Sequence, residues 1–148
     1  MTQQIPDLRH PMLRGLYEFW KGYCAVDSVA GATDIDPADL RPWIGNLLIM
    51  DVIEGDNFIY SYYGDAFQQA FGDSMVGKSI ELLPPEQREL LHTEYDRVRR
   101  ERVPVMRSYT ADFNGRMATW ERLVLPLTST GETVDKLLVA AYQLPDDA

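Results

Sequence analysis

One run of the sequence has residue types and spacing that could do phosphate chemistry. Gly72-Asp73-Ser74-Met75-Val76-Gly77-Lys78-Ser79 fits the pattern GxxxxGK[ST]. In that pattern, backbone amides surround the phosphates of a nucleotide, the lysine pairs with their charge and the hydroxyl binds Mg²⁺. Taken alone, the run would make the protein an NTPase.

The residues on either side argue against this interpretation. A phosphate loop needs a buried strand before it and a long helix that starts at the Lys-Ser pair. Here Ala66–Phe71 has helical character, and only Ile80–Leu83 separates the loop from Pro84-Pro85, which does not allow one uninterrupted helix. We therefore expect a tight loop with a solvated lysine, and the NTPase is the least favoured function.

The sequence shows no other catalytic constellation. The serines lie outside any nucleophile elbow, and the carboxylates form no spaced acid pair. Cys24 falls on the apolar edge of the first expected helix, where a buried and inert thiol is expected. A single cysteine forms no thiolate cluster, and His10 has no partner at metal-ligand spacing. We predict a protein that is not an enzyme and that has no metal site.

Composition places the chain among ordinary globular domains. Its 148 residues suit a single domain over 1–148, with 45% apolar and 25% charged residues. The formal net charge of −9 would repel nucleic acids and anionic membrane surfaces. Met1–Asp7 is polar, without a secretory leader, and no apolar run approaches a membrane span. We expect a cytoplasmic protein that binds neither nucleic acid nor membrane.

An amphipathic helix is expected near the N-terminus, over about residues 11–25, with a proline in its first turn. Its apolar residues recur at helical spacing and form one stripe: Leu13, Leu16, Tyr17, Trp20 and Tyr23. Because a contiguous apolar stripe does not stay in water, it must pack on the protein's own sheet, on a partner chain, or on both. We expect a homodimer, with these residues as candidates for the dimer contact or for packing on the sheet.

The rest of the chain is predicted to form an α+β fold. Apolar alternation between turn residues predicts strands over 47–53, 58–63, 105–113, 117–128 and 134–144. Asn114-Gly115 is the strongest hairpin signal. A short helix over 66–71 and a longer one opened by Pro84-Pro85 lie between the second and third strands. The order predicts a five-stranded antiparallel sheet with a helical insert, a core over about 36–144 and the N-terminal helix.

This order and several short motifs resemble the PAS family. The motifs are Leu40-Arg41-Pro42 leading to Asp51-Val52, Tyr62-Tyr63-Gly64, Phe71-Gly72 with Gly77-Lys78, and Glu121-Arg122-Leu123-Val124-Leu125-Pro126-Leu127. They are similar to a subfamily of stand-alone single PAS domains, best known from alphaproteobacteria and mostly without an assigned role. The resemblance covers about residues 8–144. It implies a sensory or regulatory module that binds a small ligand or a signalling partner, and it carries over no catalytic residues.

In PAS domains a ligand, where there is one, lies between the inner face of the sheet and the helical insert. The candidates for a pocket lining here are Tyr62, Phe67, Phe71, Met75, Leu91, His92, Tyr95, Met106 and Trp120. Aromatic and methionine side chains would suit a small apolar or amphipathic ligand. The alternative is that the same residues fill the core of a ligand-free structural interaction domain.

His92 leaves a second alternative open. With Tyr95 three positions on and Leu82-Leu83-Pro84-Pro85 upstream, it resembles the proximal-histidine helix of haem-binding PAS sensors, in which the imidazole binds iron. This resemblance implies a haem-based gas or redox sensor. The surrounding motifs belong to the other subfamily, and His92 falls at the edge of the apolar stripe. The cofactor therefore stays open, with haem as the less favoured option.

Two adjacent charged residues must point to opposite faces of one strand. Alternation places Arg122 with Trp120 and Val124 on one face, and Glu121 with three leucines on the other. The leucine face is the more apolar, so we expect it to meet the core. Arg122 would then lie on the outer face and pair with an acid of the N-terminal helix such as Glu18. A ligand carboxylate is the other candidate partner.

Overall fold

One mixed sheet forms the centre of the computed structural model, which describes residues 8–24, 29–53, 57–113 and 115–145, without the side chains of 70, 71, 111–113 and 116. Its strands are β1 (Ala30–Gly31), β2 (Leu47–Ile53), β3 (Asn57–Tyr63), β4 (Val105–Phe113), β5 (Arg116–Thr128) and β6 (Lys136–Gln143). Five of them follow the antiparallel order β3-β2-β6-β5-β4. The predicted α+β fold with its five-stranded antiparallel sheet is confirmed.

The sequence analysis missed the sixth strand. β1 has two residues and pairs in parallel with the end of β5, at Leu127 and Thr128. β4 pairs with the same edge of β5 only as far as Val124. The short strand therefore extends the edge where β4 has ended, and two residues are too few to carry an alternation pattern.

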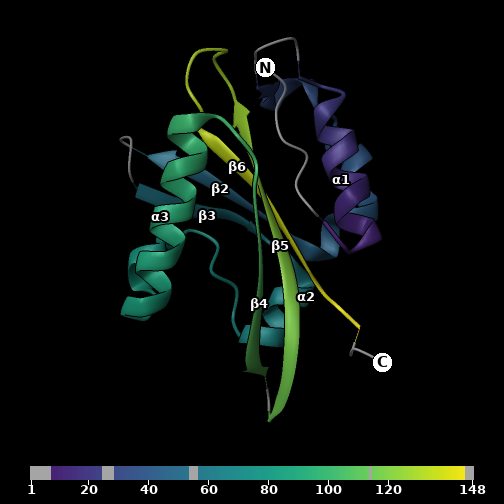
Figure 1. Ribbon diagram of the computed structural model, residues 1–148. Coiled ribbons are helices and arrows are strands. Elements are labelled where there is room, and N and C mark those ends of the chain that lie inside the picture. Colours follow the sequence, from purple (N-terminus) through teal and green to yellow (C-terminus); the bar gives the residue numbers. More distant parts are fainter. Residues whose placement is uncertain (1–7, 25–28, 54–56, 114, 146–148) are drawn as a thin grey trace.

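Helices cover both faces of this sheet. α1 (Pro11–Lys21) lies on one face, whereas α2 (Asp65–Phe71) and α3 (Pro85–Glu101) belong to the insert between β3 and β4. Figure 1 shows α1 and α3 on opposite sides of the long strands β5 and β6. Three 3-10 helices complete the fold: η1 (Ala32–Asp34), η2 (Pro37–Asn46) and η3 (Ile80–Leu82). α1 ends at Lys21, earlier than expected, in a tight turn where the N–H of Tyr23 donates to the carbonyl of Trp20 at 3.0 Å.

The apolar stripe of α1 packs on the protein's own sheet. Its residues Leu13, Leu16, Tyr17 and Trp20 are at most 1% exposed, and Tyr23 is half-buried. The indole N–H of Trp20 donates to the carbonyl of Pro126 in β5 at 2.8 Å. The chain therefore covers this stripe itself, and a second chain is not needed to keep it from water.

A buried carboxylate ties the segment before α1 to the middle of β5. Glu121 is 0% exposed, and it accepts the backbone N–H of Arg9 at 2.8 Å and that of His10 at 2.7 Å. His10 is the N-cap of α1, and its Nδ1 accepts the N–H of Met12 at 3.1 Å. Glu121 thus fixes the start of the helix on the sheet, while the side chain of His10 caps the first turn.

Gly64 allows β3 to turn into α2 close against η2. Its N–H donates to the carbonyl of Leu47 at 2.8 Å. A Cβ at this position would lie 2.5 Å from the carbonyl oxygen of Gly45. No L side chain fits that space, so the turn requires glycine.

Replacing Trp20 by alanine should lower the free energy of unfolding by about 3–5 kcal/mol, because the change leaves a cavity under α1 and an unpaired carbonyl. Urea denaturation followed by circular dichroism measures this loss. The exposed neighbour Lys21 supplies the control, since Lys21→Ala should change the same quantity by about 0.5 kcal/mol or less. A loss below about 1 kcal/mol for Trp20→Ala would contradict the packing described here.

Stability should also depend on the protonation of His10. Burial lowers the pKa of His10 below its ordinary value of 6.5, although the charge of Glu121 opposes this shift. The folded state therefore favours the neutral ring, and its contribution is complete above the ordinary pKa and lost as the pH falls through the lower, folded one. His10→Asn keeps a capping oxygen that does not titrate. Between about pH 7 and about pH 5, the melting temperature of the wild type should fall more steeply than that of His10→Asn; parallel curves would argue against the effect.

Candidate ligand-binding site

A cavity of about 300 Å³ lies between the sheet and the helical insert. Strands β2, β3, β4 and β5 form its floor, α2 and the loop after it form one wall, and the start of α3 forms the other. Its described lining residues are Leu48, Tyr60, Tyr63, Phe67, Asp73, Met75, Leu83, Pro84, Gln87, Leu91, Tyr95, Tyr109 and Arg122. The lining is largely apolar and aromatic, with one buried charged side chain.

Several side chains expected at a pocket lie at this cavity. Phe67, Met75, Leu91 and Tyr95 line it. Trp120 belongs to the same core cluster and is 6% exposed, but it is not among the described lining residues. The side chain of Phe71 lies outside the described part of the chain.

The expected position of Tyr62 at the cavity is wrong. Ile49 pairs with Tyr62, but the next residue, Met50, pairs with Tyr60, so β3 bulges at Ser61. The bulge moves Tyr62 to the α1 face, where it packs against that core and its hydroxyl donates to the carbonyl of Ile44 at 2.8 Å. The next residue along β3 takes the inner position in its place, and no pattern in the sequence announces the extra residue.

The expected position of Met106 at the cavity is also wrong, because Met106 packs on the α1 face. Its neighbours Val105 and Tyr109 belong to the core on the insert side, and β4 alternates without interruption between them. The odd positions from 105 to 109 therefore face the insert, and Tyr109 lines the cavity. Applied strictly, alternation could have shown that Tyr109 and not Met106 belongs to the lining.

A buried ion cluster forms part of this site. One carboxylate oxygen of Glu94, in α3, bonds Arg122 in β5, and the other bonds Arg107 in β4. The side chains of Glu94 and Arg122 are 7% and 10% exposed, whereas Arg107 is 42% exposed. The expectation that Arg122 lies on the outer face and pairs with Glu18 is wrong, because both faces of β5 are covered and the Arg122 face meets α3.

The guanidinium of Arg122 is not fully used by this cluster. Its Nε has no hydrogen-bond partner within the described part of the protein. Its Cζ lies 5.5 Å from the centre of the Tyr109 ring, which suits a cation–π contact. Burial lowers the pKa of Arg122, but the neighbouring Tyr95 and Glu94 raise it by more, so the side chain stays charged. A buried cation with a spare donor therefore lines the cavity.

The phenols around the cavity stay neutral at ordinary pH. Burial raises the pKa of Tyr95 to about 12, although the charge of Arg122 opposes the shift. Burial also raises the pKa of Tyr60 and Tyr109. Neutral phenols can both donate and accept hydrogen bonds, so the site can meet a polar group of a ligand as well as an apolar body.

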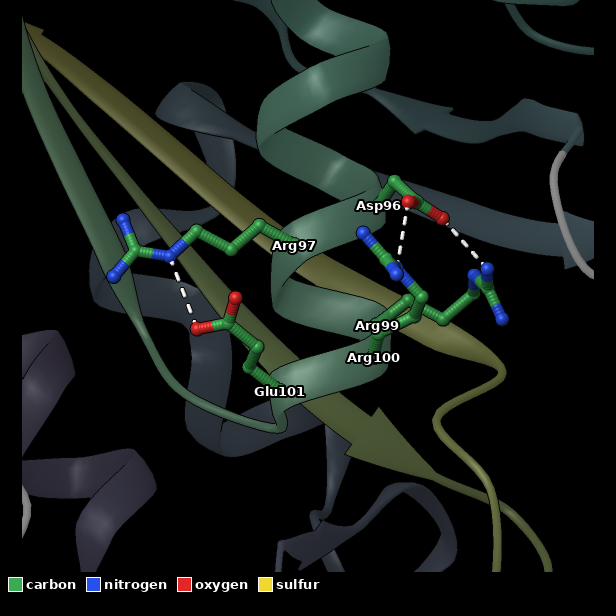
Figure 2. A network of polar contacts seen from close by, with 5 residues as sticks. All are labelled: Asp96, Arg97, Arg99, Arg100 and Glu101. Atoms are coloured by element: carbon green, nitrogen blue, oxygen red, sulfur yellow. Dashed lines mark hydrogen bonds and ion pairs between the residues drawn. The ribbon is translucent and has the colours of Figure 1, made fainter.

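The solvent side of α3 carries a separate set of ion pairs (Figure 2). Asp96 bonds Arg99 at 2.6 Å and Arg100 at 2.8 Å, and Arg97 bonds Glu101 at 3.2 Å. Partial burial acts to raise the pKa of Asp96, but the two arginines lower it by more. These pairs follow the i, i+3 and i, i+4 spacing of a helix surface. Glu94 takes part in none of them and pairs instead with arginines of the sheet.

His92 lies away from the cavity. It lines a shallow depression on the other side of α3 with Glu81, Arg88, Glu89 and Thr93. Its ring meets the edge of Phe58, with 5.6 Å between the ring centres. The described cavity lining does not include it, so the geometry gives the haem hypothesis no support.

Residues of the phosphate-loop pattern form hydrogen bonds with β3, the edge strand of the sheet. Gly77 donates its N–H to the carbonyl of Tyr60 at 2.7 Å, and the carbonyl of Lys78 accepts the N–H of Tyr60 at 3.0 Å. The hydroxyl of Ser79 donates to the side chain of Asn57 at 2.8 Å. The amide of Gly77 and the hydroxyl of Ser79 are thus engaged with β3, the amide of Lys78 donates within the loop to Met75, and a helix, α2, precedes the loop.

The described residues offer neither a metal site nor a membrane-spanning helix. They contain no group of three or more His, Cys, Asp or Glu side chains placed to hold a metal ion. Within the described part of the chain, every helix is too short or too polar to cross a membrane.

An antiparallel sheet with a helical segment inserted between its second and third strands, β3 and β4, defines the class of small α+β domains that the motifs suggested. The sequence matches a family model described as the PAS domain over residues 8–141. This chain belongs to the PAS domain family, as its motifs suggested. No curated protein matches the sequence.

Solved structures with the same fold include a PAS domain and a sensory box sensor histidine kinase. The PAS domain from Bordetella pertussis BvgS superposes with a TM-score of 0.57 at 17% identity, over 74% of this chain and 86% of that one. A sensory box sensor histidine kinase from Vibrio cholerae gives 0.51 at 16% identity, over 72% and 88%. At these identities the likeness concerns the fold alone.

Removing the carboxylate of Glu94 should cost about 3–5 kcal/mol of unfolding free energy in Glu94→Ala, because Arg122 is then buried without a counterion. The paired replacement Glu94→Gln/Arg122→Met should cost clearly less, since it removes both charges. Arg107→Ala should cost about 1 kcal/mol or less, because this partner is half exposed. Urea denaturation of the three variants measures these losses, and equal losses for Glu94→Ala and Arg107→Ala would contradict the cluster.

Proposed function

We propose that this PAS domain is a sensory or regulatory module whose inner cavity binds a small amphipathic molecule, and that it has no catalysis of its own. The observation that carries this proposal is the cavity itself. Its volume of about 300 Å³ lies at the lower end of known ligand pockets, and its apolar walls surround a few convergent polar groups. The rival is an interaction domain in which the same side chains adjust to fill the space.

The cavity touches the elements that a signal would have to move. Its lining comes from the sheet, from the loop after α2 through Met75, from Leu83 after η3, and from the first half of α3 through Gln87 and Leu91. A ligand in this position contacts both the rigid sheet and the insert. It can therefore favour one packing of the insert over another, provided that it binds the two with different affinity.

A second copy or a signalling partner would need a surface other than the apolar stripe of α1. The apolar stripe of α1 is buried on the sheet, so a homodimer would use other residues of the helix or another face. The homodimer, the signalling partner and the cytoplasmic location remain proposals. Each is compatible with a module that passes ligand occupancy to another protein.

A thermal-shift screen with small amphipathic molecules tests the proposal. A ligand at about 100 times its dissociation constant should add about 2.7 kcal/mol, or roughly 5–10 °C in melting temperature. Leu83→Trp, which adds a large side chain at the cavity wall, should abolish the shift. Met117→Trp, at an exposed position on β5, is the matched control and should keep it. The proposal fails if no compound stabilises the wild type more than Leu83→Trp.

A further inference from the structure

In the ion cluster beside the cavity, positive side chains outnumber negative ones. Arg122 and Arg107 share the single carboxylate of Glu94, so the cluster has one uncompensated positive charge. Of the described lining residues only Asp73 and Arg122 carry formal charge, and Asp73 is exposed to solvent whereas Arg122 is buried. The buried charge that faces the cavity is therefore the guanidinium of Arg122, while the excess positive charge of the cluster lies on the half-exposed Arg107 beside it.

The unused donor is located where this charge lies. The Nη2 of Arg122 donates to Glu94, while its Nε is buried and has no hydrogen-bond partner among the described residues, so a ligand must displace neighbouring atoms to reach it. A buried N–H without a partner is costly, and a ligand that met it would gain about tenfold or more in affinity over one that did not. A carboxylate accepts hydrogen bonds from a guanidinium and also compensates its charge.

The remaining lining residues indicate the chemistry of the part of such a ligand that does not contact Arg122. Phe67, Met75, Leu83 and Leu91 form apolar walls on the side of the insert. The hydroxyl groups of Tyr60, Tyr63, Tyr95 and Tyr109 come from residues that line the same cavity, and neutral phenols can donate to an anion. A cationic ligand would be repelled by the buried guanidinium, and a fully apolar one would leave its donor unmet.

We propose that the cavity selects an amphipathic monocarboxylate, with its apolar body against the insert and its carboxylate on Arg122. This inference rests on the proposed function and adds the chemical class of the ligand. It also gives Arg122 two roles, a structural pair with Glu94 and a contact with the ligand. The carboxylate brings the charge of the cluster to zero.

Matched acids and amides test the inference. The pairs are phenylacetate, 3-phenylpropanoate, 4-phenylbutanoate and octanoate, each against its own carboxamide, with affinities from isothermal titration calorimetry. In the wild type, at least one acid should bind about tenfold more tightly than its amide. The Nε–Hε signal of Arg122 in a ¹H–¹⁵N spectrum should shift with that acid and much less with the amide.

The variants separate a ligand contact from a structural role. Glu94→Gln/Arg122→Met removes both buried charges, and in this folded variant the acid and the amide should bind equally. Arg100→Met removes one positive charge from the solvent side of the same α3 helix and should keep the tenfold preference. Arg122→Lys keeps the positive charge but loses the planar, forked arrangement of guanidinium donors. The preference for the acid over its amide should therefore be smaller in this variant.

Each outcome bears on a different claim. If amides bind as well as acids in the wild type, the inference is overturned and the proposed function stands. If the preference persists in Glu94→Gln/Arg122→Met, the carboxylate is recognised elsewhere and the assignment to Arg122 is wrong. If no member of any pair binds at millimolar concentration, the inference fails, whereas the proposed function is decided by the broader thermal-shift screen.

Discussion

The structure depends on a constraint at the centre of β5, where two oppositely charged residues stand side by side and both are buried. Glu121 points to the α1 face and accepts backbone amides of the segment before that helix. Arg122 points to the insert face and bonds Glu94 of α3. Burying either charge is costly without a partner, so each one holds the layer that supplies that partner. The strand thus fastens both helical layers to the sheet, and the cavity lies beside one of these two anchors.

The sequence was sufficient for the order of elements because the signals concerned were local. Turn residues, alternation and proline positions predicted the strands over 47–53 and 105–113 and the helix that begins at Pro85. The PAS family followed from their order together with short motifs. The same reasoning placed Phe67 and Tyr95 at the cavity, because both lie on stripes that only one core can bury.

The failures have physical causes that are not local. A bulge at Ser61 changed the face of Tyr62, and a bulge depends on how two strands pair. Arg122 was misplaced because only the leucine face of β5 was expected to meet the core, while β5 is covered on both faces and needs an internal partner on each. The phosphate-loop pattern was rejected from the residues around it, without long-range information. In the structure, Gly77 and Ser79 bond β3, whereas the N–H of Gly72 donates to Gln68 of α2.

The strict alternation of β5 also limits how this domain can change in evolution. Deleting or inserting one residue within the strand would turn every later side chain to the other face. Glu121 would then face α3, Arg122 would face α1, and Leu123 would exchange its core with Val124. Both cores and both buried charges would be lost in one step. Length variation among relatives should therefore gather in the loops outside β5, whereas the strand itself changes only by substitution.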